Sequence, residues 1–194
     1  MSIPLEEAER FRKHLQQLYT AYLSVFPQEE ARLALLKSCI ERGEPLHART
    51  AMTGHVTASA YVLAPDRQRL LLVYHRTLDD WLAPGGHYEV RDGDLVGCAR
   101  REAQEEAGIE ELSLDAWHSR LSIPIDIDIH RIPSNPMKDE TEHDHFDCRY
   151  VFHAFTTVFW GAPREVSAVK WRPLAEIELQ ASVYPVVQKI LRFL

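Results

Sequence analysis

Apolar residues recur at every third or fourth position along the first 42 residues, a period typical of amphipathic helices. One such set comprises Leu5, Ala8, Phe11, Leu15, Leu18, Tyr19 and Tyr22. A second set lies between Ala31 and Ile40, and the stop signals Gly43 and Pro45 follow it. The pattern predicts a helical hairpin. We interpret residues 1–48 as a helical N-terminal extension for packing or dimerisation, attached to a second domain over residues 49–194.

The pattern changes to alternation after residue 53. Residues 55–63 alternate and residues 69–74 form a nearly continuous apolar run, which predicts two strands, the second of them buried. Further strands are predicted near 123–130, 146–157 and 169–171, with helices over about 95–108 and 183–194. Pro84, Gly85 and Gly86 are predicted to form a turn. Strands mixed with a few helices predict an α/β sandwich around a mixed sheet.

Composition narrows the classes of partner. The 194 residues are 45% hydrophobic and 26% charged, the balance of a soluble globular protein. The net charge of −7 argues against binding nucleic acid by bulk charge, and the apolar runs are too short to span a bilayer. We expect the protein to be located in a reducing cytoplasm, because its three cysteines are scattered and its N-terminus has no signal-peptide character.

Acidic residues concentrate between Glu89 and Glu111, where eight acids stand against three arginines. On the helix predicted there, Glu102, Glu105 and Glu106 share an arc of about 100°, beside a small apolar edge. Like charges at this spacing repel one another by about 0.2–0.5 kcal/mol per pair, and a bound cation relieves that repulsion. Carboxylates are preferred ligands of Mg²⁺ and Mn²⁺. The arc therefore indicates a divalent cation site, with a solvated acidic face as the alternative.

The residues around this arc resemble the signature of the Nudix hydrolase superfamily, G-x5-E-x7-R-E-U-x-E-E-x-G-U, where U is a bulky apolar residue. Residues 101–109, Arg-Glu-Ala-Gln-Glu-Glu-Ala-Gly-Ile, match its second half, although Ala103 is small for U. The resemblance extends over about residues 50–180, and it implies a Nudix-like α/β/α sandwich with the helical hairpin outside it.

The first half of the signature is matched less closely. Asp92 stands where the signature has Glu, and the segment from Gly86 to Arg101 is one residue longer. The upstream acid therefore stays open between Glu89, Asp92 and Asp94.

The resemblance implies a metal-dependent pyrophosphohydrolase that uses Mg²⁺ or Mn²⁺ to cleave a nucleoside diphosphate linked to another moiety. It assigns the metal to Glu102, Glu105, Glu106 and the Gly85 carbonyl, and it implies that Arg101 orients the carboxylates. A non-catalytic nucleotide-binding regulatory module of the same fold is the alternative. A homodimer is a further expectation.

A general base must take a proton from the attacking water. Relatives use either a glutamate of the signature or one on a loop before a late strand that contains a tryptophan. Glu102 is the first candidate. Glu165, six residues before Trp171 in a Pro-containing loop, is the second, with a plain surface glutamate as its alternative interpretation.

Two alternating strands carry a further set of polar residues. Alternation places Asp126, Asp128 and His130 on one face of the first strand. It places the following on one face of the second: His143, His145, Asp147 and Arg149. Paired, these faces predict a polar wall beside the acidic helix, which would bind substrate, hold a second metal such as Zn²⁺ or Mn²⁺, or face solvent. The substrate-binding candidates are Gly86, His87, His145, Asp147 and Arg149.

Overall fold

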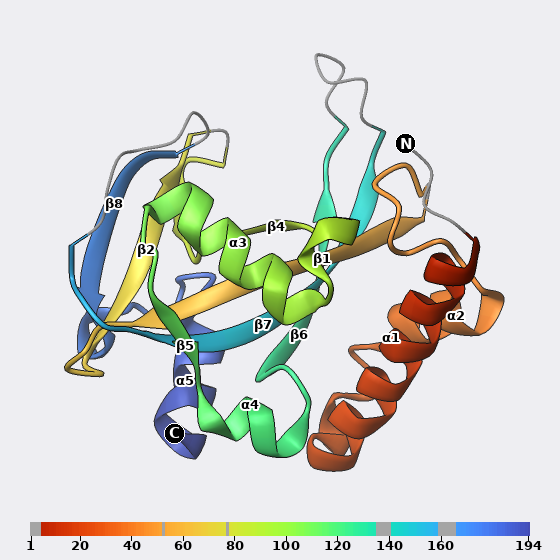
Figure 1. The fold of residues 1–194 in the computed structure, drawn as a ribbon, viewed down its shortest axis with the longest axis horizontal. Helices are drawn as coiled ribbons and strands as arrows, with labels where there is room; N and C mark the ends of the chain where they lie inside the picture. The colour runs from red at the N-terminus through yellow and green to blue at the C-terminus, as the bar shows by residue number, and fades with distance from the viewer. Residues whose placement is uncertain (1–4, 52, 77, 135–140, 159–165) are drawn as a thin grey trace.

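The computed structural model describes residues 5–51, 53–76, 78–134, 141–158 and 166–194. Its strands form one curled mixed sheet with helices packed around it (Figure 1). The predicted α/β/α sandwich around a mixed sheet is therefore confirmed. Among the described residues, no helix combines the length and the apolarity that crossing a membrane would need.

The centre of the sheet is a parallel pair of long strands, β1 (Gly54–Leu63) and β7 (His143–Ala154). Their register places His55 opposite His145, Thr57 opposite Asp147 and so on along ten residue pairs. Nearly all of β1 is buried, as expected for a strand covered on both faces. This pairing brings polar residues from two distant parts of the chain onto one face.

The remaining strands pair antiparallel to these two or to β2. The strand β2 (Arg69–His75) pairs with β1, β3 and β8, while β5 and β6 pair with β7 and β4 pairs with β1. Their bounds are β3 (Asp80–Leu82), β4 (Gly85–His87), β5 (Leu112–Leu114), β6 (Asp126–Ile132) and β8 (Val166–Pro173).

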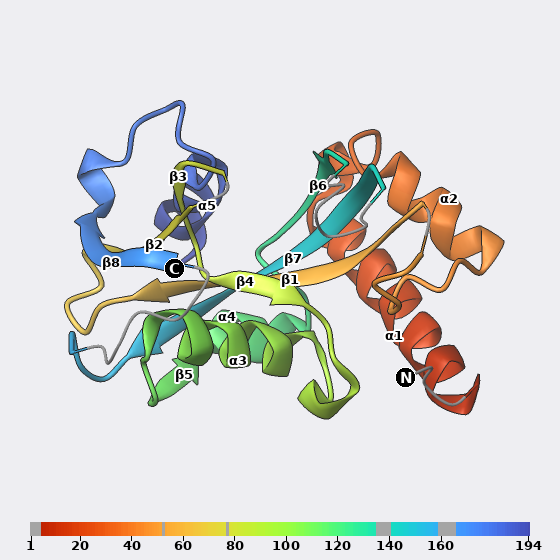
Figure 2. The same cartoon turned by 90° about the horizontal axis from the view of Figure 1, so that it is seen from above.

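Helices lie on both faces of the sheet. Figure 2 shows α3 (Leu95–Ala107) on one face and α5 (Tyr184–Phe193) on the other. The N-terminal hairpin, α1 (Leu5–Val25) and α2 (Ala34–Arg42), lies at one end of the sheet (Figure 1). Its buried residues, among them Tyr22 and Leu36, belong to the same hydrophobic core as the sheet. The described part of the chain therefore has a continuous core.

The sequence pattern did not predict several short strands and helices. The predicted turn at Pro84–Gly86 was wrong in part, because Gly85–His87 forms strand β4 against β1. A Cβ on Gly85 would come within 2.3 Å of the Ser59 hydroxyl oxygen, so glycine is required by close strand approach. The three-residue strands β3 and β5 and the helix α4 (Ala116–Leu121) are too short to show a period.

Candidate active site

The helix α3 presents its acidic edge to the short strand β4. Asp94 caps its first turn by accepting a hydrogen bond from the Gly97 amide at 2.7 Å, and Gly108 ends it in the left-handed region. The fully buried Ala99, Ala103 and Ala107 place the helix close to the sheet. The carboxylates beside this small-residue edge lie against strand β4.

The structure brings the predicted metal-binding residues together. Glu106 accepts a hydrogen bond from the Gly85 amide at 3.1 Å. The carboxylate of Glu102 lies against Gly86 so closely that a Cβ there would stand 2.3 Å from Oε1. Glu105 is half-exposed and pairs with Arg101 and Arg91. The three carboxylates and the Gly85–Gly86 backbone thus form one cluster of oxygen donors.

Arg101 lies at the centre of the hydrogen bonds in this cluster. Its Nη1 donates to Glu102 at 2.8 Å and to Glu105 at 3.1 Å, and its Nη2 donates to the His87 carbonyl at 2.9 Å. Its Nε and Nη2 also hold both oxygens of Asp92, at 2.7 and 3.1 Å. The guanidinium therefore fixes two carboxylates of α3 relative to strand β4.

Among the upstream acids, the structure pairs Asp92 with Arg101. Glu89 instead pairs with Arg91, and Asp94 caps α3. The carboxylate of Asp92 is almost completely buried, and it also accepts a hydrogen bond from the Glu89 amide. Of the three acids that the sequence left open, Asp92 is therefore the one that contacts Arg101.

The electrostatics of the cluster suit a divalent cation. Burial raises the pKa of Glu102 above its ordinary value, although the charge of Arg101 opposes this shift. The hydrogen bonds that Arg101 donates to Asp92 are the main cause that raises the pKa of Arg101. A cation would stabilise the ionised form of Glu102, and the oxygen-only donor set fits Mg²⁺ or Mn²⁺ better than softer ions.

The predicted polar wall exists, but its placement beside the acidic helix was wrong. Side chains alternate along β4, so the face at Gly86 that meets Glu102 is opposite to the face that carries the His87 ring. Register then places Asp147 and His145 on the His87 side of the sheet. The wall therefore lies across the sheet from α3.

The wall is a buried ion network and not a solvated face. Arg149 pairs with Asp147 at 2.9 Å, with Asp128 at 2.8 Å and with Asp126 at 3.2 Å. Asp147 also accepts hydrogen bonds from the hydroxyls of Thr57 and Ser59. Burial of Asp126, Asp147 and Arg149 exceeds nine-tenths, so these groups hold the strands together through one another.

Residues outside the predicted wall complete this network. Lys189 of α5 lies 2.7 Å from Asp126, and Arg32 of the hairpin lies 3.1 Å from the same carboxylate. Tyr22 donates to Glu29, which also pairs with Lys189. Sequence reasoning missed these contacts, because nothing in a helical period shows which distant strand a helix will cover.

Histidines occupy the other end of the wall. His145 and His87 have ring centroids 5.0 Å apart, and His55 of β1 lies 4.7 Å from each. The sequence pattern predicts only that His55 lies in a strand, and the parallel pairing of β1 with β7 brings it to His145. Glu165 lies outside the described residues, so its position in the site stays a prediction.

Three comparisons place the chain among known proteins. The NUDIX domain model matches residues 53–193. A Lactococcus lactis subsp. cremoris protein named "Probable DHNTP pyrophosphohydrolase" is 31% identical over 96 residues, which are 50% of this chain and 52% of the relative. The chain thus spans about half the length of this curated relative.

Solved structures resemble the fold. A C. elegans Ap4A hydrolase in a binary complex is 16% identical, with a TM-score of 0.52 over 71% of this chain and 96% of that one. An E. coli dihydroneopterin triphosphate pyrophosphohydrolase is 19% identical, with a TM-score of 0.49 over 71% and 93%. At such identities the Ap4A hydrolase supports likeness of fold alone.

The curled mixed sheet and the carboxylates of α3 that Arg101 holds indicate that this chain is a Nudix-fold protein. The chain belongs to the NUDIX domain family, whose model covers well over half of its length. The resemblance drawn from residues 101–109 is confirmed.

Proposed function

We propose that this chain is a Mg²⁺- or Mn²⁺-dependent pyrophosphohydrolase that cleaves a nucleoside diphosphate linked to another moiety, by attack of water at phosphorus. The observation that carries the proposal is the cluster of Glu102, Glu105 and Glu106 against the Gly85–Gly86 backbone. Membership of the NUDIX domain family and the pyrophosphohydrolase name of the Lactococcus relative support it.

Each residue of the cluster would contribute in its own way. Glu102, Glu105, Glu106 and the Gly85 carbonyl would hold the cation, which when bound neutralises diphosphate charge and lowers the pKa of a bound water. Arg101 would keep Glu102 and Glu105 in position through its hydrogen bonds. Such positioning is the main requirement of in-line attack at phosphorus.

The proton of the attacking water would pass to a carboxylate. Glu102 is the first candidate, because its partly buried carboxylate lies against the Gly86 backbone within the cluster. Glu165 is the second. A side chain at Gly86 would occupy space beside Glu102, so this glycine leaves bare backbone where phosphate can approach.

The substrate face would include the His87 and His145 rings, with Gly86 at its edge. Asp147 and Arg149 belong to the proposal as the buried support of that face, because each is already held by the ion network. We further propose a cytoplasmic location, which the three unpaired cysteines Cys39, Cys98 and Cys148 support.

A substrate screen tests the proposal. The full chain is incubated with nucleoside di- and triphosphates, dinucleoside polyphosphates, nucleotide sugars and DHNTP, each with Mg²⁺, with Mn²⁺ or with excess chelator. We expect cleavage of at least one diphosphate linkage, lost in the chelator. Turnover undiminished by chelator would overturn the metal mechanism. Nucleotide binding without any turnover would instead favour the regulatory module.

A further inference from the structure

Five histidines gather on the face of the sheet that points away from α3. They come from four strands: His55 of β1, His87 of β4, His130 of β6, and His143 and His145 of β7. The ring centroid of His55 lies 4.7 Å from those of His87, His143 and His145, and His130 lies 5.4 Å from His145. The proposed pyrophosphohydrolase mechanism places His87 and His145 on the substrate face, but it assigns no role to His55, His130 or His143.

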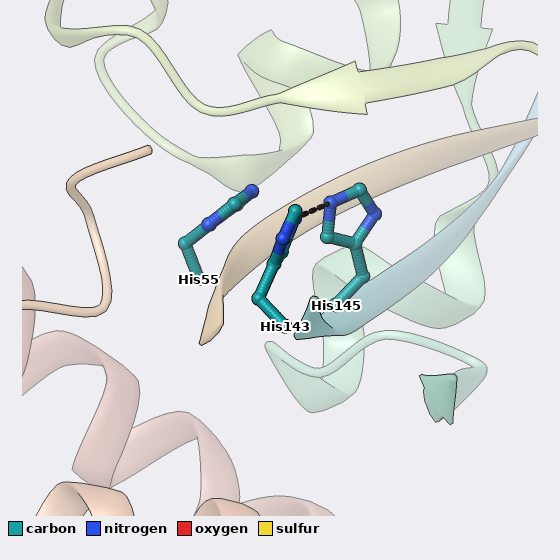
Figure 3. A group of neighbouring side chains, drawn as sticks. All are labelled: His55, His143 and His145. Atoms are coloured by element: carbon teal, nitrogen blue, oxygen red, sulfur yellow. Dashed lines mark hydrogen bonds between the residues drawn. The ribbon is translucent and has the colours of Figure 1, made fainter. Parts of the chain in front are cut away.

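Three of these rings offer nitrogen atoms at the spacing of metal ligands. One ligand atom each from His55, His143 and His145 lies within 4.8 Å of the other two. Figure 3 shows the three rings gathered together, with a hydrogen bond between His143 and His145. The Nε2 atoms of these two rings are 3.2 Å apart, and one of them carries the shared proton in the metal-free protein. Nitrogen ligands of a tetrahedral Zn²⁺, at about 2.0–2.1 Å from the metal, lie about 3.3 Å from one another. The Nε2 atoms of His143 and His145 already stand at nearly this separation.

The hydrogen bond of His143 sets its tautomer for binding a metal. Its Nδ1 lies 2.7 Å from the Thr141 carbonyl oxygen, which can only accept a hydrogen bond. Nδ1 therefore carries the proton, and the lone pair is at Nε2, on the side of His145. Metal-ligating histidines typically make this kind of hydrogen bond to a carbonyl or carboxylate.

The rings lie in a buried part of the sheet. His55 and His143 are buried, and His145 is half-buried between them and His87. Neutral imidazole is the form that binds metal. A structural histidine of this protein looks different: backbone groups of Ile123 and Val151 occupy both ring nitrogens of His118.

We propose that His55, His143 and His145 bind one Zn²⁺ ion, at a site separate from the carboxylates of α3. Imidazole nitrogen suits Zn²⁺ and the ions near it in the first transition row, whereas Mg²⁺ prefers oxygen. Three protein ligands leave a fourth position for a water or an anionic group. The His87 ring lies 4.7 Å from the His55 ring, and the His87 backbone carbonyl accepts a hydrogen bond from Arg101 of the carboxylate cluster.

Zinc binding is measured on the full chain after it has been stripped with chelator. The stripped chain is dialysed to equilibrium against Zn²⁺ in a buffer that contains excess Mg²⁺ to occupy the carboxylates. We expect one bound Zn²⁺ per chain. Loss of an outer hydrogen-bond partner weakens metal sites by about 10–100-fold, so loss of a ligand in His145→Ala or His143→Ala should weaken binding at least as much. Cobalt substitution should give the visible spectrum of a tetrahedral site.

Two controls make the outcome decisive. His14→Ala, on the exposed side of α1, should bind Zn²⁺ as the wild type does. Zinc should raise the melting temperature of the wild type but not that of a histidine variant whose metal-free protein still melts cooperatively. If Glu105→Gln with Glu106→Gln abolishes zinc binding while His145→Ala does not, the ion lies on α3 and the proposal is wrong. Absence of bound Zn²⁺ from the wild type would also overturn it, without touching the pyrophosphohydrolase proposal.

Discussion

Arg101 and Asp92 form a buried two-point ion pair, with Nε 2.7 Å from one carboxylate oxygen and Nη2 3.1 Å from the other. The side chain of Asp92 is only 1% exposed. The segment between Gly86 and Arg101 is one residue longer than the Nudix signature, and in it an aspartate, one methylene shorter than glutamate, reaches the guanidinium. The pair leaves Nη1 of Arg101 directed at Glu102 and Glu105.

Removal of Asp92 should affect both stability and turnover. Breaking a buried ion pair by deleting one partner costs about 3–5 kcal/mol, because the other charge is left unpaired. We expect Asp92→Ala to lower the free energy of unfolding on this scale and to lower kcat, since Arg101 loses its anchor. Urea unfolding and kinetics of Asp92→Ala beside the exposed Glu110→Gln would check this. Equal stability of the two variants would contradict it.

Neutralising a metal-binding glutamate should separate activity from stability. In Glu105→Gln and Glu106→Gln, one charge leaves a crowded acidic arc, so repulsion falls in the metal-free protein. The cation site that lowers the barrier is weakened at the same time. We expect kcat to fall by roughly 10²-fold or more, with a melting temperature without metal equal to or above that of the wild type. A variant that melts lower and stays fully active would show these glutamates to be structural.

The two neighbouring glycines should respond differently to a methyl group. A Cβ at Gly86 would meet the Glu102 carboxylate at 2.3 Å, whereas one at Gly85 would meet Ser59, including its Cα at 3.0 Å. A flexible carboxylate can move away and a strand backbone cannot. We therefore expect Gly86→Ala to lose turnover mainly and Gly85→Ala to lose stability mainly. Thermal melts and kcat of both variants test this contrast, and the reverse pattern would refute it.

The sequence pattern predicted individual helices and strands well, but it did not predict which strands lie side by side in the sheet. The period predicted a helix over about 95–108, and α3 spans Leu95–Ala107, because this signal is local in the chain. The parallel pairing of β1 with β7 joins segments about ninety residues apart, and no local pattern encodes it.

The same difference between local and tertiary signals applies to the candidate site. The Nudix-like segment named Glu102, Glu105 and Glu106 because they share one helix. The polar wall was predicted on the wrong side of the sheet. The contributions of His55, Arg32 and Lys189 were not predicted, because each reaches its partners only through tertiary packing.

Acid should remove a contribution that Asp128 makes to stability. Burial raises the pKa of this carboxyl, but its hydrogen bond with His130 and the charges of Arg149 and Arg32 outweigh burial and bring it to about 2, from an ordinary 3.8. Because the folded-state pKa is lowered, ionised Asp128 stabilises the fold above about pH 4, and the stabilisation is lost as pH falls towards 2.

The variant Asp128→Asn should therefore be less stable than the wild type by about 2 kcal/mol at pH 7, and the difference should shrink between about pH 4 and pH 2. Urea midpoints at a series of pH values measure it, with the exposed Glu111→Gln as control. A difference that stays constant down to pH 2 would mean that the carboxylate charge is not the cause.

The identity of the general base is decided by comparing Glu102→Gln with Glu165→Gln. A general base contributes about 10²–10⁴-fold to the rate, so the variant that lacks it should lose kcat on that scale with little change in KM. Glu102 has the support of a partly buried carboxylate within the cluster, while the sequence places Glu165 in a Pro-containing segment six residues before Trp171. A surface glutamate would change kcat by about twofold or less, since such substitutions shift energies by no more than about 0.5 kcal/mol.

Loss of rate in Glu165→Gln alone would assign the base to Glu165 and leave Glu102 as a metal ligand. If only Glu102→Gln is impaired, the base lies on α3 and Glu165 has no part in the mechanism.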